Sequence, residues 1–171
     1  MPGNSELVML DEHADRRQFG KVLGALVAGL AARPVFAVAR PSIQHIVHSA
    51  AQWRSVLGPQ RYAILREAGT EPPFSSPLLN EHRRGLFRCA GCSLPLFSST
   101  TKFESGTGWP SFWQALPSSI ETRPDHSYLM DRTEVLCARC EGHLGHVFND
   151  GPRPTGLRYC MNGLALQFTP A

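Results

Sequence analysis

Two cysteine doublets constrain this chain more than any other feature of its sequence. Cys89-Ala90-Gly91-Cys92 and Cys137-Ala138-Arg139-Cys140 are both C-x-x-C units, and each unit presents two thiolates from one tight turn. Two such units supply the four sulfur ligands that a structural Zn²⁺ prefers in a tetrahedral site. The sequence therefore predicts one structural Zn²⁺ per chain, held by the four doublet cysteines: Cys89, Cys92, Cys137 and Cys140.

The two doublets are far apart in the sequence, because residues 93–136 separate them. A metal site tolerates this separation, since the entropic cost of closing a loop grows only with the logarithm of its length. Two disulfides are an alternative that would suit an exported protein. A redox-active C-x-x-C is a third interpretation, but neither doublet stands between a strand pattern and a helix pattern.

The composition is that of an ordinary folded domain. Of the 171 residues, 42% are hydrophobic and 18% are charged, whereas disordered chains combine low hydrophobicity with high net charge. The length suits one domain. Seventeen lysines and arginines against fourteen aspartates and glutamates give a net charge of +3. These cations form no basic run, so we expect no nucleic-acid partner.

The first 39 residues are typical of an export signal. The pair Arg16-Arg17 precedes an uncharged stretch at 22–32, and a small-x-small motif at 37–39 offers a cleavage site. The arginine pair resembles a twin-arginine signal, which predicts a signal segment at 1–39 and a periplasmic protein. The alternative is an ordinary helix in a cytoplasmic protein. The uncharged stretch is shorter than the about 20 residues of a spanning helix, so we expect no stable membrane association.

The rest of the chain divides into two parts. Residues 40–84 are predicted to form a helical and extended N-terminal arm, with two short helices over 49–69 because Gly58 ends one and Pro59 opens the next. Nothing in this arm indicates chemistry of its own.

Residues 85–171 are predicted to form a zinc-binding catalytic β core. Short apolar runs predict strands at 94–97, 133–136 and 164–168. Several strands at short spacing favour a small antiparallel sheet or barrel.

The fifth cysteine is left over from the zinc doublets and is the candidate nucleophile. Cys160 stands between Arg158 and Asn162, and on a strand the three side chains would share one face. The guanidinium of Arg158 would favour the thiolate, and the amide of Asn162 could orient a polar substrate atom. The alternatives are an inert buried thiol and a cysteine that pairs between chains.

Two histidines and a carboxylate lie upstream, in a Gly-rich segment that we interpret as a turn region. Because histidine as a residue type titrates near neutral pH, His143 and His146 are the candidate proton donors for chemistry at Cys160. Asp150 could fix the tautomer of one imidazole. Because Cys140 comes just before His143, a bound metal would hold this segment rigid.

A third segment, at 102–113, places an aromatic side chain at a backbone bend. Its central sequence is Gly106-Thr107-Gly108-Trp109-Pro110. The ring of Trp109 is interpreted either as an apolar wall that receives a small alkyl group or as a core side chain beside a turn.

A series of sequence blocks in this order resembles one enzyme family, the B-type peptide-methionine (R)-S-oxide reductases. The resemblance covers roughly residues 53–168. Its blocks are residues 69–71, 73–75, 89–97, 102–103, 105–112, 132–135, 137–140, 143–148, 150–152 and 154–162.

This resemblance implies a mainly β fold of two small antiparallel sheets with the zinc site. It also implies an enzyme that reduces the R epimer of methionine sulfoxide in oxidised proteins or peptides. Cys160 would attack the sulfoxide sulfur, and His146, with His143 and bound water, would protonate the departing oxygen. The other implied site residues are Asn162 and Asp150 in the same polar network, and Trp109, Phe148 and Arg158 at the substrate.

Two positions depart from the family pattern. Many relatives have a resolving cysteine where this chain has Thr107, and the other four cysteines are assigned to zinc. The resemblance therefore implies a sulfenic acid on Cys160 that an external thiol, from a thioredoxin-like protein or a small molecule, reduces directly. The second departure is Tyr128-Leu129, since relatives often have a glycine before Met130.

Two other classes of function stay open from the residues alone. A non-enzymatic zinc module that binds a protein partner would need no nucleophile at Cys160. A cysteine hydrolase would direct the thiolate at an acyl carbon, although no oxyanion-hole pattern is evident.

Overall fold

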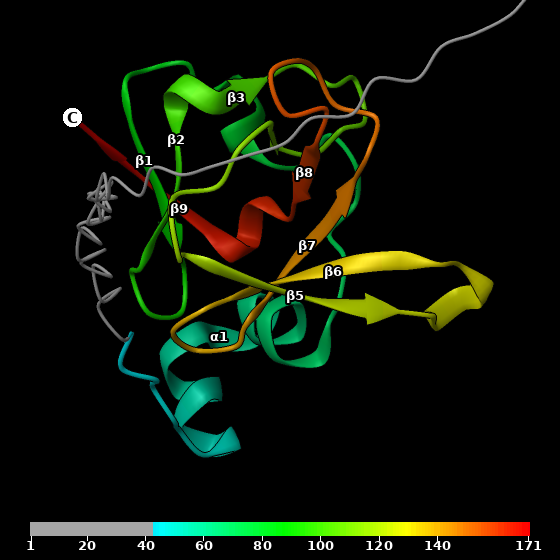
Figure 1. The fold of residues 1–171 in the computed structure, drawn as a ribbon. Coiled ribbons are helices and arrows are strands. Elements are labelled where there is room, and N and C mark those ends of the chain that lie inside the picture. The colour runs from blue at the N-terminus through cyan, green and yellow to red at the C-terminus, as the bar shows by residue number, and fades with distance from the viewer. Residues whose placement is uncertain (1–42) are drawn as a thin grey trace, which may run out of the picture. The chain divides into compact units, whose positions relative to one another are not determined.

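The computed structural model describes residues 43–171, and the predicted signal segment at 1–39 lies outside the described residues. Two antiparallel sheets and one kinked helix make up this part of the chain (Figure 1). The predicted mainly β fold with two small antiparallel sheets and short N-terminal helices is confirmed. Within residues 43–171, no helix is long and apolar enough to cross a membrane.

The smaller sheet has three strands, and one of its edge strands lies at the C-terminal end of the chain. Its strands, in spatial order, are β2 (Pro95–Ser98), β1 (Gly85–Cys89) and β9 (Leu166–Pro170). The sequence predicts Leu164 in the last strand, but a 3₁₀ turn at Gly163–Ala165 precedes β9 instead. The turn forms because the carboxylate of Glu71 accepts hydrogen bonds from the backbone N–H groups of Gly163 and Leu164.

The larger sheet has six strands, and every neighbouring pair is antiparallel. In spatial order they are β3 (Lys102–Phe103), β4 (Ser111–Phe112), β8 (Arg158–Met161), β7 (His143–Phe148), β6 (Arg132–Cys137) and β5 (Ile120–Asp125). The prediction of a turn region at the two histidines is wrong. The segment is a strand because β6 and β8 hydrogen-bond to its two edges.

Aromatic side chains join the two sheets. Phe97 of β2 stacks on Phe112 of β4 with ring centroids 4.4 Å apart, and Phe87 of β1 meets Phe112 edge-on at 4.9 Å. All three rings are fully buried. Since burying such a side chain contributes about 1.5–3 kcal/mol, this cluster is a main source of stability between the sheets.

The helix α1 (Ala50–Glu67) consists of two helical pieces, as predicted. Ser49 and Gln52 form a capping box at its start, and Gly58 breaks the helix with φ of 69° and ψ of 172°. Its buried side chains are Trp53, Leu57, Ile64 and Leu65, and they belong to the same hydrophobic core as the sheets. The N-terminal arm is therefore an integral part of the core.

Candidate active site and metal centre

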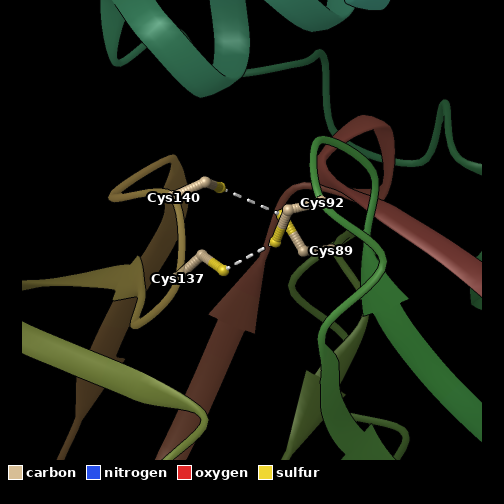
Figure 2. Close-up of side chains that lie close together, drawn as sticks. All are labelled: Cys89, Cys92, Cys137 and Cys140. Atoms are coloured by element: carbon tan, nitrogen blue, oxygen red, sulfur yellow. Dashed lines mark hydrogen bonds between the residues drawn. The ribbon is translucent and has the colours of Figure 1, made fainter. Parts of the chain in front are cut away.

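The four doublet cysteines converge between the two sheets (Figure 2). Cys89 ends β1 and Cys137 ends β6, while Cys92 and Cys140 lie in the turns that follow. Their Sγ atoms all lie within 4.8 Å of one another. The separation is 3.6 Å between Cys89 and Cys140 and 3.5 Å between Cys92 and Cys137. The cluster thus links the smaller sheet to the larger one.

The sulfur geometry fits a tetrahedral metal ion. Four sulfurs at about 2.3 Å from one Zn²⁺ stand about 3.8 Å apart, whereas a disulfide needs about 2.05 Å. All five cysteines of the chain are free, so the disulfide alternative is not what the structure contains. Hydrogen bonds with Cys137 and the other two cysteines, together with burial, raise the pKa of Cys89. Four thiolates at this spacing therefore need a cation beside them.

A β-bulge places both histidines of β7 on one face of the larger sheet. His143 lies opposite Leu136 and Gly145 lies opposite Val135, so Leu144 is the extra residue. Without a bulge, residues three apart on a strand face opposite sides. The two imidazole rings instead lie edge to face, with centroids 5.5 Å apart.

Cys160 stands directly opposite His146 across β7 and β8, and opposite Ser111 of β4 on the other side. Directly opposite residues of antiparallel strands point to the same face, so the thiol and the imidazole share it. Both line a pocket of about 130 Å³. The other residues of its lining are Thr70, Trp109, Arg132, Gly145, Phe148 and Asn162. The structure therefore brings five of the predicted site residues together: Cys160, His146, Trp109, Phe148 and Asn162.

Each histidine is paired with a carboxylate of the β5–β6 hairpin. His146 Nε2 lies 2.7 Å from Oδ2 of Asp125, and His143 Nδ1 lies 2.6 Å from Oε1 of Glu134. The prediction that Asp150 fixes an imidazole tautomer is wrong, because its carboxylate binds an arginine instead. Alternate residues of β5 and β6 reach the histidine face and take this role.

The charges of these pairs follow from their surroundings. Burial lowers the pKa of His143, although the neighbouring Glu134 carboxylate acts in the opposite direction. Hydrogen bonds from Ser127 and the paired histidine lower the pKa of Asp125. Burial would raise the pKa of Glu134, but hydrogen bonds from Arg123 and His143 outweigh it and lower the pKa. Both carboxylates are therefore ionised at neutral pH. His143 itself is buried and is not part of the pocket lining.

The Cys160 thiol is held in its protonated form. Burial raises its pKa, and the lowering effects of the Thr107 hydroxyl and the Arg158 guanidinium do not outweigh burial. Thr107 Oγ1 lies 3.7 Å from Cys160 Sγ. Arg158 is fixed by Asp150 at 2.8 and 2.9 Å and lies over the ring of Phe148, 4.4 Å from its centroid. Arg158 thus lowers the pKa of Cys160, as expected, but its effect is smaller than that of burial.

The N-terminal arm contributes to the pocket, although nothing in its sequence indicates chemistry of its own. Thr70 lines the pocket. The backbone of Glu71 holds two other lining residues: its carbonyl accepts a hydrogen bond from Trp109 Nε1 at 3.1 Å, and its N–H donates to Asn162 Oδ1 at 3.0 Å. The block at 69–71 in the family resemblance was the available signal for both arm residues.

Sequence reasoning also missed three charged residues of the β5–β6 hairpin: Asp125, Arg132 and Glu134. Arg132 Nη2 donates to Asp125 Oδ2 at 2.7 Å, which places this ion pair beside His146. The available signal was the alternation of Arg132 and Glu134 in an otherwise apolar strand, because alternate residues share a face.

Comparison with known proteins identifies the family to which this chain belongs. The SelR domain matches residues 57–170, which is more than half of the chain. The chain belongs to the SelR domain family. Cys160, both histidines and all four clustered cysteines lie inside this SelR domain.

Several curated relatives of this SelR domain are named peptide methionine sulfoxide reductase MsrB. The one from Thiobacillus denitrificans is 56% identical over 121 residues, which cover 70% of this chain and 92% of that protein. The one from Methanosarcina mazei is 54% identical over 125 residues, covering 72% and 89%. The one from Bradyrhizobium diazoefficiens is 56% identical over 126 residues, covering 73% and 91%. The B-type reductase family predicted from the sequence is thereby confirmed.

Proposed function

We propose that this chain reduces the R epimer of methionine sulfoxide in oxidised proteins, with Cys160 as the nucleophile. Relatives that are named methionine sulfoxide reductases share more than half of their residues with it over most of their length. The observation that carries the proposal is the pocket that Cys160 shares with His146 and Trp109. A thiol, a titratable imidazole and an apolar wall are the groups that this reaction needs.

The reaction balances with the groups in this pocket. Cys160 Sγ attacks the sulfoxide, the S–O bond of the substrate breaks, and the oxygen ends on Sγ as a sulfenic acid. The cysteine sulfur is oxidised by two electrons and the methionine sulfur is reduced by two. Because a sulfoxide oxygen leaves poorly as an anion, His146 protonates it during the attack. The thiol proton replaces the one that the imidazole gives, so no net proton is consumed.

The carboxylate beside His146 supports this step. Asp125 lies 2.7 Å from the imidazole and is ionised at neutral pH. A negative charge at this distance stabilises the protonated imidazole that delivers the proton.

The pocket walls distinguish the two epimers. The indole of Trp109, fixed through Glu71, and the ring of Phe148 form an apolar wall for the ε-methyl group. His146 and Asn162 form a polar wall for the oxygen. The S epimer exchanges methyl and oxygen, and a sulfoxide oxygen without a hydrogen-bond donor loses stabilisation.

An external thiol regenerates the enzyme in this proposal. Cys160 has a hydroxyl, from Thr107, where a second thiol would be needed for an internal disulfide. The other four cysteines are gathered in the metal-type cluster. Two thiol groups of a thioredoxin-like protein or of small molecules therefore convert the sulfenic acid back to the thiol, with release of water and formation of their own disulfide.

We assign the four-cysteine cluster to one structural Zn²⁺ per chain. All four protein ligands are sulfur, which is the donor set of closed zinc sites. When bound, the ion supplies a cross-link between the sheets. The four cysteines hold the turn before β7, and β7 carries His146.

We also propose export to the periplasm, on the strength of the twin-arginine pair at 16–17 and the small-x-small motif at 37–39. Amino-terminal sequencing of the secreted protein should begin at Arg40. A cytosolic protein that starts at Met1 would contradict export and leave the chemistry untouched.

Kinetics on each purified sulfoxide epimer test the proposed reaction. With excess dithiothreitol, the wild-type chain should convert an (R)-sulfoxide peptide at least about 100-fold faster than the (S)-sulfoxide peptide. Cys160→Ser should lose at least about 1,000-fold in rate, because a hydroxyl replaces the nucleophile. The variant should keep its metal content and circular dichroism spectrum. Equal rates on the two epimers, or an active Cys160→Ser, would refute the proposal.

A further inference from the structure

The tip of the β5–β6 hairpin, residues 127–130, presents large apolar side chains to solvent. Tyr128 is 84% exposed, Leu129 is 104% exposed and Met130 is 46% exposed. Figure 1 shows the hairpin extending away from the other strands. An exposed aromatic and aliphatic cluster on a projecting turn is a candidate interaction site.

The backbone of the tip is strained by the residues that it carries. Tyr128 has φ of 55° and Leu129 has φ of 57°, so two successive non-glycine residues are in the left-handed region. This conformation costs of order 1–3 kcal/mol per residue, and glycine or asparagine would adopt it with less strain. An aromatic and an aliphatic side chain therefore stand exposed on a backbone that glycine or asparagine would adopt more easily.

Two adjoining cavities lie between the tip and the nucleophile. Tyr128 lines an outer cavity of about 440 Å³. This outer cavity shares Thr70, Arg132 and His146 with the pocket that contains Cys160. A molecule bound at Cys160 therefore leaves the pocket along a path toward the tip.

The walls of the outer cavity match the main chain of a polypeptide. Arg123, Asp125, Arg132 and Glu134 line it as two ion pairs, Arg123 with Glu134 and Arg132 with Asp125, so polar groups of both signs stand beside peptide C=O and N–H dipoles. The Nε atom of Arg132 is buried and has no acceptor among the described residues. An unpaired buried N–H is costly, and a peptide carbonyl that reaches it as the side chain shifts would remove this cost.

We propose that the hairpin tip docks an apolar side chain next to the oxidised methionine of an extended polypeptide substrate. The inner pocket of about 130 Å³ is sized for one side chain, so the substrate backbone continues through the outer cavity. Tyr128 and Leu129 then cover a neighbouring aromatic or branched aliphatic residue of that chain. This inference rests on the proposed function and adds a preference for apolar sequence around the oxidised methionine.

Rates on three substrates test the docking role. They are the small N-acetyl methionine (R)-sulfoxide methylamide, a peptide with leucine and phenylalanine beside the sulfoxide, and the same peptide with serines there. The tip variants are Tyr128→Asn and Leu129→Asn, because asparagine tolerates the left-handed conformation. Val47→Asn is the matched control, since Val47 is 88% exposed and lines neither cavity.

In the wild-type chain, kcat/KM should be about tenfold higher for the apolar peptide than for the serine peptide, because burying one large apolar side chain supplies this factor. Each tip variant should reduce this ratio by at least about threefold, and Val47→Asn should leave it unchanged. The rate on the small sulfoxide should stay the same in all variants.

Other results overturn the proposal. Equal wild-type rates on the two peptides, or a ratio that the tip variants do not change, would show that the tip does not bind the residues beside the oxidised methionine. A wild-type dimer that the tip variants convert to monomer, with no change in the ratio, would assign the tip to a second copy of the chain. Absence of any rate on the small sulfoxide would refute the proposed function itself.

Discussion

At the scale of the residue, opposing effects determine the pKa of the Cys160 thiol. Burial raises its pKa, while Thr107 and Arg158 lower it without reversing the shift. The resting enzyme therefore keeps a protonated thiol, which resists non-specific oxidation because the thiolate is the reactive form. In the reaction proposed above, that proton stays within the active site.

This balance predicts how the thiol responds to pH. The rate of Cys160 alkylation by iodoacetamide should rise with pH and reach half its maximum above the ordinary cysteine value, because a raised pKa keeps the thiol protonated to higher pH. Arg158→Met should move the midpoint further upward by removing one of the lowering effects. Arg84 is an exposed arginine, so Arg84→Met is the control and should leave the midpoint of the pH profile unchanged. A midpoint that falls in Arg158→Met would show that the guanidinium does not favour the thiolate.

At the scale of the element, strand pairing assembles the site. The bulge in β7 turns His143 and His146 to one face, and pairing with β8 sets His146 opposite Cys160. Residues of β5 and β6 then bring carboxylates to the same face.

The Asp125–His146 pair leads to a test at this scale. Asp125→Asn should lower kcat by about tenfold to 100-fold with little change in KM, because the amide no longer stabilises the protonated imidazole. Asp131→Asn, whose carboxylate is exposed and pairs with His126, is the matched control. A loss confined to KM would assign Asp125 to substrate binding instead.

Local sequence patterns predicted part of this arrangement. The clustering of the two cysteine doublets could be predicted because ligand spacing is a local signal, and the role of Cys160 as nucleophile stays a prediction. The partners of the histidines could not, because Asp125 lies 21 residues from His146 and only sheet register brings them together. The strand β7 was missed because its glycine and bulge disguise the alternation. The contacts of Glu71 with Asn162 and Gly163 span 91 and 92 residues, so no short sequence pattern could predict these pairings.

At the scale of the whole molecule, the four-cysteine cluster and the helix hold the sheets together. Arg66 of α1 donates to the carbonyl of Cys140 at 2.7 Å, and its guanidinium lies 5.1 Å from the ring of Trp53. The helix therefore packs beside the turn that carries Cys140. The cysteine cluster, the helix and the aromatic core thus meet at the same junction between the sheets.

Removal of the metal should destabilise the entire fold. The purified chain should contain one zinc per molecule. Cys92→Ser, or treatment with a strong chelator, should lower Tm by at least about 10 °C, because structural zinc contributes several kcal/mol to folding. Cys160→Ser should keep its zinc and its Tm within about 2 °C. An unchanged Tm after complete loss of metal would contradict a structural role for the cluster.

The most direct test of the central claim is the mass of the chain after a single turnover. The wild-type enzyme is mixed with excess (R)-sulfoxide peptide in the absence of any thiol, and the protein is mapped by mass spectrometry. We expect one methionine formed per chain and a gain of about 16 Da, one oxygen atom, on the peptide that contains Cys160. A loss of two hydrogens through a disulfide to a doublet cysteine, or methionine formed with Cys160 unchanged, would contradict the account.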